Sequence, residues 1–125
     1  IPVIRAFRCD HGGFSQVREA IHRFRQSGPV PAAVLVDAHV PGQYGGTGQV
    51  LPWHQLDLVD GGVDGIPLVL SGGLTAENVA SAILQARPWA VDTASGVESA
   101  PGHKDPDLVV RFVAQAAAVF SELEG

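Results

Sequence analysis

The sequence predicts an α/β fold in which strands and helices alternate around a parallel sheet. Short apolar runs of strand length recur four times along the 125 residues, and three of the segments between them have helical character. Two of the apolar runs lead directly into small flexible residues, a glycine pair at Gly72-Gly73 and Ser95-Gly96. Strict alternation of this kind is typical of βα units and implies parallel strands joined by right-handed crossovers.

The alternation resolves into four βα units with no linker and no second domain. In chain order, the expected elements are a strand at 2–7, a helix at 14–26, a strand at 33–37, a short helix at 53–60, a strand at 66–70, a helix at 75–86, a strand at 89–93 and a helix from 106 onward. The strand at 33–37 is apolar almost throughout, as is usual for parallel strands that are buried on both faces. The glycine-rich loop at 38–51 follows it, and long loops at strand ends are usually functional.

Capping residues and apolar periodicity support the three longer helices. The first helix places Val17, Ile21 and Phe24 on one face, and Gly28-Pro29 ends it. Thr75 is the expected N-cap of the second helix, whose inward residues are Val79, Ala82, Ile83 and Ala86. Asp105-Pro106 is the expected start of the last helix, with the proline at the first helical position. The expected apolar stripe of that helix consists of Val109, Val113, Ala116 and Phe120.

Composition excludes several classes of protein. The formal net charge of −5 argues against nucleic acid or an anionic membrane surface as a partner. The chain has a single cysteine, so no disulfide within the chain is expected, and it has no apolar run of membrane-spanning length. These features predict a soluble cytoplasmic protein. The five histidines have no spacing typical of metal ligands, so no metal is expected.

Two kinds of candidate site residue follow the predicted strands. Asp37 ends the second strand, where barrel enzymes place catalytic groups, although a loop aspartate can equally cap the following turn. Taken alone, the residues favour the capping interpretation of Asp37. Glycines let a backbone approach an anion closely, so a phosphate cradle is expected at Gly72, Gly73, Ser95 and Gly96. The alternative is that these are ordinary turn residues, but two cradles at consecutive strand ends make it the weaker interpretation.

An ordered series of motifs resembles the phosphoribosylanthranilate isomerases of tryptophan biosynthesis. The matching segments are Leu35-Val36-Asp37-Ala38, Gly45-Gly46-Thr47-Gly48, Trp53, Leu70-Ser71-Gly72-Gly73-Leu74, Glu77-Asn78-Val79, Val91-Asp92, Ser95-Gly96-Val97-Glu98 and Pro101-Gly102-His103-Lys104-Asp105. That family folds as a TIM (βα)8 barrel. The resemblance implies that residues 1–125 form the C-terminal half of such a barrel, from about strand 5 to strand 8. The absence of methionine and an opening that reads as the interior of a strand also predict the C-terminal part of a longer protein.

The resemblance also assigns chemistry to individual residues. It implies conversion of N-(5-phosphoribosyl)anthranilate to 1-(2-carboxyphenylamino)-1-deoxyribulose 5-phosphate, without a cofactor and with Asp37 as general acid. It places Asp92 in the pocket, with a purely structural role as the equal alternative, and gives Gly46 a role in shaping the loop over the substrate. The family's general base is a cysteine on the first barrel strand. Cys9 does not match that position, so the base is expected outside this chain.

Several alternatives remain open at the level of sequence. The related histidine-pathway isomerase, which acts on ProFAR, performs the same rearrangement on a substrate with two phosphates. A half-barrel can also be a non-catalytic phosphate-binding module that self-associates. Either way, the uncovered sheet is expected to need the missing N-terminal half or a second copy as its partner. Arg5 is expected to fill a layer of the barrel, and Glu98 and Lys104 can serve loop structure alone.

Overall fold

A parallel sheet forms the centre of the structure, a computed structural model that describes residues 1–8, 14–38, 53–56 and 58–124. Its parallel strands are β1 (Ile4–Arg8), β2 (Ala33–Asp37), β4 (Ile66–Ser71) and β5 (Ala90–Val91), and they are hydrogen-bonded in that order. A two-residue strand, β3 (Gly62–Val63), pairs antiparallel with the start of β4. The predicted α/β class with a parallel sheet is therefore confirmed, and the expected strand at 33–37 matches β2 residue for residue.

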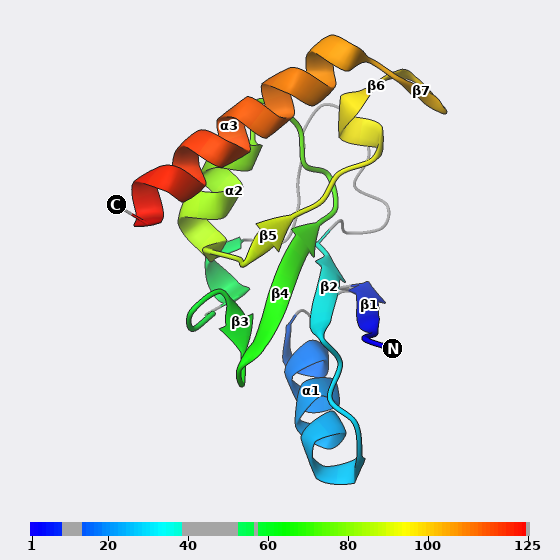
Figure 1. The fold of residues 1–125 in the computed structure, drawn as a ribbon, viewed down its shortest axis with the longest axis vertical. Coiled ribbons are helices and arrows are strands. Elements are labelled where there is room, and N and C mark those ends of the chain that lie inside the picture. Colours follow the sequence, from blue (N-terminus) through cyan, green and yellow to red (C-terminus); the bar gives the residue numbers. More distant parts are fainter. Residues whose placement is uncertain (9–13, 39–52, 57, 125) are drawn as a thin grey trace.

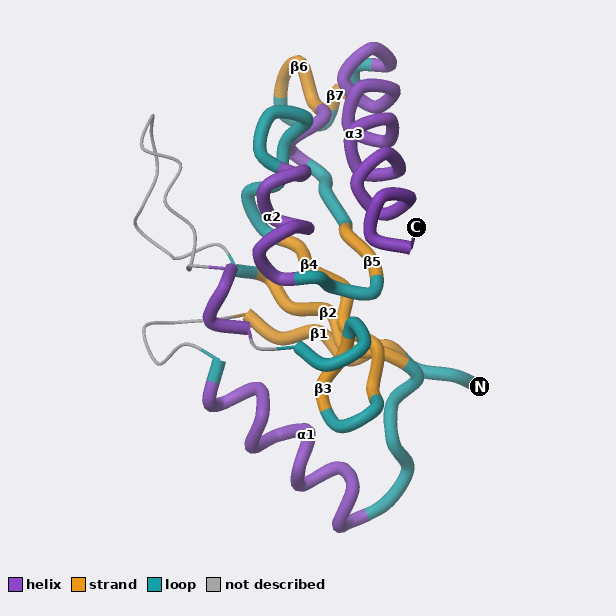
Figure 2. Tube along the Cα trace, turned by 90° about the vertical axis from the view of Figure 1, so that its left-hand side faces the viewer, coloured by secondary structure: helices purple, strands orange, loops and turns teal. Residues whose placement is uncertain are grey.

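The longer helices lie at the two ends of the molecule. They are α1 (Ser15–Ser27), α2 (Val79–Ala86) and α3 (Pro106–Glu124). Helices α2 and α3 pack against each other at one end, and α1 lies at the other (Figures 1 and 2). Between β5 and α3 the chain forms a 3-10 turn, η2 (Ser95–Val97), and a small hairpin of β6 (Glu98–Ala100) and β7 (His103–Lys104). None of the described helices is both long and apolar enough to cross a lipid bilayer.

The two faces of the sheet differ in burial. Side chains alternate along a strand, so Val34 and Val36 of β2 share one face, and both are fully buried. Leu68 and Leu70 are their register partners on β4 and are also fully buried. On the opposite face Leu35 is only half-buried, and Ile4 of β1, which lies on that face, is 60% exposed. The core therefore fills the helix-bearing face, while the second face is apolar and open among the described residues.

Two of the predicted helix faces agree with the structure. Val17 and Ile21 of α1 are buried and Phe24 is half-buried. The inward residues predicted for α2 (Val79, Ala82, Ile83 and Ala86) are all buried. Thr75 caps α2 from one turn before its first assigned residue, because the Thr75 amide donates to Asn78 Oδ1 at 2.8 Å and the Asn78 amide donates to Thr75 Oγ1 at 3.3 Å. This reciprocal pair is a capping box closed by asparagine.

The start of α3 was predicted correctly, and its buried stripe only in part, since Ala116 is buried and Phe120 half-buried as expected. Asp105 Oδ1 accepts hydrogen bonds from the amides of Asp107 (2.9 Å) and Leu108 (3.4 Å), which makes Asp105 the N-cap. The buried residues of α3 are Phe112, Ala116 and Val119. Val113, expected in the core, is 57% exposed, and Val109 is 36% exposed. The helix has two apolar stripes, and packing against α2 buries the one that contains Phe112.

The predicted short helix at 53–60 is only partly present. A 3-10 helix, η1, spans Trp53–Leu56 and buries both of its end residues. The chain then turns at Asp60-Gly61, where both residues have positive φ, and enters β3. Apolar periodicity over this stretch is too short to distinguish a helical turn from a hairpin arm, and the positive φ of Asp60 excludes a continuing helix.

Truncation of Phe112 tests which stripe of α3 is structural. Phe112→Ala is expected to lower the free energy of unfolding by about 3 kcal/mol, because it removes a buried ring between α2 and α3. The matched change Val113→Ala, one residue further along, is expected to cost less than about 1 kcal/mol. Chemical denaturation of both variants measures the difference. Equal losses would show that the second stripe is also packed.

Candidate functional site

Three polar side chains meet at the carboxyl ends of neighbouring strands. Asp37 ends β2 and Ser71 ends β4, and the two are direct register partners. Asp92 follows β5, and Ser71 Oγ donates a hydrogen bond to Asp92 Oδ2 at 3.1 Å. All three lie on the face opposite the buried Val36 and Leu70, because side chains alternate along each strand. The parallel register thus gathers two carboxylates and a hydroxyl along one rim of the sheet.

A glycine loop leaves β4 at this rim. Gly72 and Gly73 have φ values of 96° and 69°, a left-handed backbone that favours glycine. Beyond them Leu74 is buried, and Asn78 Nδ2 donates to the Gly73 carbonyl at 2.9 Å. The same asparagine closes the capping box of α2, so one side chain fixes both the loop and the start of the helix. Because α2 begins only at Val79, its helical amides lie beyond this loop rather than within it.

The second predicted loop is locked onto the first. Thr93 Oγ1 donates to the Leu74 carbonyl at 2.7 Å. Gly96 packs against the same carbonyl so closely that a Cβ at this position would overlap the Leu74 oxygen and would come within 2.7 Å of Thr93 Oγ1. A side chain at residue 96 would therefore separate the loops. The glycine requirement here comes from close approach of two backbones, a signal that the sequence does not reveal.

The two loops enclose a cavity of about 390 Å³. Its lining residues are Asp37, Ser71, Gly72, Gly73, Thr93, Ala94 and Ser95. The structure thus brings four of the predicted residues to one cavity: Asp37, Gly72, Gly73 and Ser95. Gly96 is not among the lining residues and packs against the Leu74 carbonyl, and Asp92 is connected to the cavity by its hydrogen bond with Ser71. Gly46, expected over the substrate, and Cys9 lie outside the described residues. Among the described residues, no group of three or more His, Cys, Asp and Glu side chains could hold a metal ion.

Sequence reasoning did not single out Ser71 and Thr93 as site residues. Ser71 lies within one of the matching segments and Thr93 at the end of the strand expected at 89–93, but neither was assigned a function. The signal of Ser71 is positional: it is the polar residue that ends β4, at the parity that faces away from the helices. Parity together with strand order identifies Ser71, whereas Thr93 is identified only by its hydrogen bond to the Leu74 carbonyl.

The β6–β7 hairpin supports the cavity from the side. Lys104 Nζ forms an ion pair with Glu98 Oε2 at 2.7 Å and also donates to the carbonyl of Ala94 at 2.8 Å. Ala94 lines the cavity, so the lysine connects the hairpin to the cavity wall. Glu98 and Lys104 therefore have contacts that maintain loop structure, which agrees with the expectation that they can serve loop structure alone.

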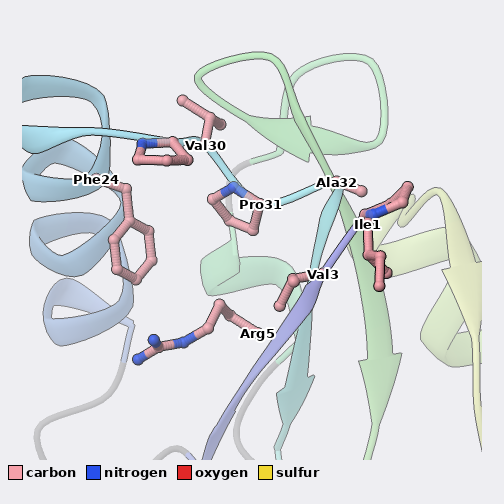
Figure 3. Close-up of a pocket in the computed structure, with 9 residues that line it drawn as sticks. Ile1, Val3, Arg5, Phe24, Val30, Pro31 and Ala32 are labelled. Atoms are coloured by element: carbon pink, nitrogen blue, oxygen red, sulfur yellow. The ribbon is translucent and has the colours of Figure 1, made fainter.

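Arg5 lies on the other side of the sheet. Its guanidinium carbon is 5.1 Å from the ring centroid of Phe24 in α1, so it faces the helix and does not fill an inner layer as expected. Figure 3 shows Arg5 extending toward Phe24 beside a separate cavity of about 500 Å³. Residues 1–3 and 29–32 contribute to that cavity, which lies at the amino ends of β1 and β2. It is therefore remote from Asp37 at the carboxyl end of β2.

Comparison with known proteins identifies the family. The sequence profile described as N-(5'phosphoribosyl)anthranilate (PRA) isomerase matches residues 1–115. The chain belongs to the PRA isomerase family. It is 48% identical over 112 residues to N-(5'-phosphoribosyl)anthranilate isomerase of Methylibium petroleiphilum, an alignment that covers 84% of this chain and 50% of the relative. The Acidithiobacillus ferrooxidans isomerase is 53% identical over 83 residues, 66% of this chain and 38% of the relative.

Solved structures of PRA isomerases share the fold. The enzyme from Thermotoga maritima superposes with a TM-score of 0.69 at 34% identity, covering 94% of this chain and 52% of that one. A PRA isomerase in complex with reduced 1-(o-carboxyphenylamino)-1-deoxyribulose 5-phosphate superposes with a TM-score of 0.64 at 31% identity, covering 94% of this chain and 50% of that one. This chain spans about half the length of the relatives it matches. The matching family profile and the relatives named here are PRA isomerases rather than histidine-pathway isomerases.

The Glu98–Lys104 pair predicts a pH dependence of stability. The Lys104 ammonium bonded to the carboxylate holds the pKa of Glu98 below its ordinary value of 4.5, and the Gly102 amide acts in the same direction. A lowered folded-state pKa stabilises the fold above the ordinary pKa, and this stabilisation is lost as the pH falls through the lowered value. Glu98→Gln is therefore expected to be less stable than wild type at neutral pH, and the difference should shrink in acid.

Thermal unfolding of wild type and Glu98→Gln across this pH range measures the effect. The matched control is Glu122→Gln, since Glu122 forms no ion pair with the described residues. A Glu98→Gln deficit that persists unchanged below the ordinary carboxyl pKa would contradict the assignment to the ion pair.

Proposed function

We propose that residues 1–125 supply one half of the active site of an N-(5-phosphoribosyl)anthranilate isomerase. The observation that carries the proposal is the shared cavity: the strand-end carboxylate of Asp37 opens on the same space as the Gly72-Gly73 loop and Ser95. A general acid and an anion cradle that line one cavity suit a phosphorylated sugar that reacts at one end and is held by its phosphate at the other. Membership of the PRA isomerase family supports the same chemistry.

The phosphate of the substrate is proposed to bind at Gly72, Gly73, Ser95 and Gly96. None of the described residues that line the cavity is a lysine or an arginine, so backbone amides are proposed to supply most of the hydrogen bonds from this part of the chain. The two glycines with positive φ leave room for close approach of an anion to the backbone. The Thr93–Leu74 hydrogen bond holds the two loops in a fixed relation, so that both can contact one ligand.

Asp37 is proposed to act as the general acid of an Amadori rearrangement. It donates its proton to the furanose ring oxygen, the C1′–oxygen bond breaks, and the nitrogen lone pair forms the Schiff base. A base then removes the C2′ proton, and the resulting enolamine tautomerises to the aminoketose. The acid transfers one proton to the substrate and the base accepts one, so atoms and charge balance over the reaction.

Asp92 and Gly46 are proposed to contact the substrate without transferring protons. Ser71 occupies Asp92 Oδ2, so Oδ1 is the oxygen proposed to accept from a substrate hydroxyl or amine. Gly46 is proposed to shape the loop that follows β2 over the bound sugar. These roles rest on the resemblance and on the position of Asp92 beside Ser71.

The remainder of the active site is proposed to come from further polypeptide. The open apolar face of the sheet and the outer edge of β1 support an architecture of four βα units that forms the C-terminal half of a TIM barrel. The relatives, about twice as long as this chain, support it too. An N-terminal half-barrel, or a second copy of this chain, would cover that face, and the general base is proposed to lie on the covering half.

Replacement of Asp37 tests the proposed function. In the native protein that carries this chain, Asp37→Asn is expected to lower kcat for PRA by roughly 10²-fold or more, because the amide has no acidic proton to donate. The thermal midpoint should change little. The matched control is Asp64→Asn, an exposed residue at a left-handed turn position that asparagine tolerates, and it should leave kcat unchanged.

Each outcome of this assay has a clear meaning. Wild-type kcat in Asp37→Asn would overturn the assignment of the general acid. A wild-type protein that binds phosphate but never isomerises PRA would favour the alternative of a non-catalytic phosphate-binding half-barrel.

Phosphate titration tests the cradle separately. Inorganic phosphate is expected to shift the amide resonances of Gly72, Gly73, Ser95 and Gly96 more than those of residues in α1. Gly96→Ala is expected to abolish these shifts and to destabilise the fold by about 1–3 kcal/mol, because the new Cβ forces the two loops apart. Ser95→Ala, a side-chain change beside it that retains the amide, should preserve most of the response. Phosphate-induced shifts centred elsewhere would contradict the proposed site.

A further inference from the structure

Lys104 is the single lysine of the chain, and it contacts the proposed phosphate cradle from outside the cavity. Its Nζ donates to the Ala94 carbonyl at 2.8 Å and is paired with Glu98 Oε2 at 2.7 Å. Ala94 and Ser95 line the cavity, whereas Lys104 is not among the lining residues. The lysine therefore reaches the backbone of the cradle without occupying the space that a ligand would fill.

The acceptor of this hydrogen bond belongs to a peptide group that the cradle also uses. The Ala94 carbonyl and the Ser95 amide are the two ends of one trans peptide group, and they point in opposite directions. The amide of the buried Val97 also donates to the Ala94 carbonyl, at 3.4 Å. Because both donors meet the carbonyl from the protein side, the Ser95 amide points the other way, toward the cavity. That amide has no acceptor among the described residues.

The glycine loop is built in the same way, but with an uncharged donor. Asn78 Nδ2 donates to the Gly73 carbonyl at 2.9 Å, and the amide of that peptide group belongs to Leu74. Asn78 is not a lining residue of the cavity either. In both loops, a side chain outside the cavity holds a backbone carbonyl, and the amide of the same peptide group is turned away from that side chain. Of the two peptide groups, only the one that contains the Ser95 amide has a full positive charge at its carbonyl.

We propose that Lys104 is a positioning residue that strengthens phosphate binding through the peptide group between Ala94 and Ser95. This inference rests on the proposed function, because it takes the cradle as the phosphate site. An ammonium group at the carbonyl end polarises the peptide, which makes the amide at the other end a stronger donor to an anion. The lysine also fixes the orientation of the peptide, so the amide does not have to turn when phosphate binds.

The position of the ammonium suits an electrostatic role. One peptide group and two hydrogen bonds separate Nζ from a phosphate oxygen at the Ser95 amide, a distance of roughly 8 Å. The Debye length at physiological ionic strength is about 8 Å, so the attraction reaches the cradle and is weakened by salt. Glu98 opposes this attraction, because its carboxylate lies beside the same ammonium and offsets its charge. The pair therefore sets the net charge next to the phosphate site.

Neutralising each member of the pair tests the proposal, because loop support and electrostatic assistance predict different signs. Inorganic phosphate is titrated into the native protein that carries this chain, and the Ser95 amide resonance is followed. Lys104→Met keeps most of the side-chain stem and is expected to raise the Kd for phosphate roughly fivefold, the upper range for a partly exposed charge. Glu98→Gln keeps an oxygen acceptor for Lys104 Nζ and is expected to lower the Kd roughly twofold, although the same variant loses stability.

Three further measurements separate polarisation of the peptide from support of the loop. Lys104→Arg retains the charge and should bind phosphate within about twofold of wild type. Added salt should reduce the difference in Kd between wild type and Lys104→Met. With PRA as substrate, Lys104→Met should raise KM and leave kcat nearly unchanged, because the phosphate does not take part in the reaction.

Controls and contrary results separate this inference from the proposed function. Arg23→Met removes a positive charge from an exposed position on α1 and should leave the Kd for phosphate unchanged. A wild-type Kd in Lys104→Met would overturn the role of Lys104 and leave the isomerase proposal intact. Unchanged or weaker phosphate binding in Glu98→Gln would show that the pair only supports the loop, and would also overturn that role. A wild-type protein in which phosphate does not shift the Ser95 amide would overturn the cradle itself, which is part of the proposed function.

Discussion

The parallel register of β2 against β4 decides which side chains reach the candidate site and which fill the core. Val36 pairs with Leu70, and both are fully buried beneath the helices. One residue further along, Asp37 pairs with Ser71 on the opposite face. A slip of one residue would exchange the two sets, burying the carboxylate and exposing the core. The cost of burying an unpaired carboxylate and the benefit of burying leucine and valine both favour the observed register.

The loops of the site depend on that register indirectly, through the residues that follow β4. The end of β4 positions Leu74, whose carbonyl accepts the Thr93 hydroxyl and contacts the backbone of Gly96. Asn78 and Lys104 then secure the outer sides of the two loops, through the carbonyls of Gly73 and Ala94. Three backbone carbonyls of these loops, those of Gly73, Leu74 and Ala94, thus accept hydrogen bonds from side chains. Such bonds tolerate changes of cavity-lining side chains better than packing contacts would.

Apolar runs and capping residues predicted most of the fold. The errors arise where tertiary packing decides which face of a helix or strand is buried. The apolar run at 33–37, the Thr75 cap and Asp105-Pro106 each determine structure through neighbours in sequence, and each matches the structure. Helix α3 has two apolar stripes, and periodicity cannot tell which one packs on α2, so Phe112 was missed in favour of Val113. Arg5 was misplaced for a related reason, since the parity of β1 depends on where its pairing with β2 begins. The candidate site residues were predicted by residue type, but Ser71 emerges only when strand order and face are known, and Thr93 only from its hydrogen bond to the Leu74 carbonyl.

Net charge is a poor guide to what this site can bind. The chain carries a formal charge of −5, and the described residues that line its candidate cavity include a carboxylate but no lysine or arginine. Anion binding then has to rely on backbone amides, which carry no formal charge and leave no trace in composition. Among the described residues, cations flank the cavity without lining it: Arg8 is the register partner of Asp37, and Lys104 Nζ donates to the Ala94 carbonyl. This has a consequence for specificity, because backbone amides accept the phosphate of any phosphorylated sugar of suitable size. Discrimination between such sugars therefore has to come from contacts with the rest of the substrate.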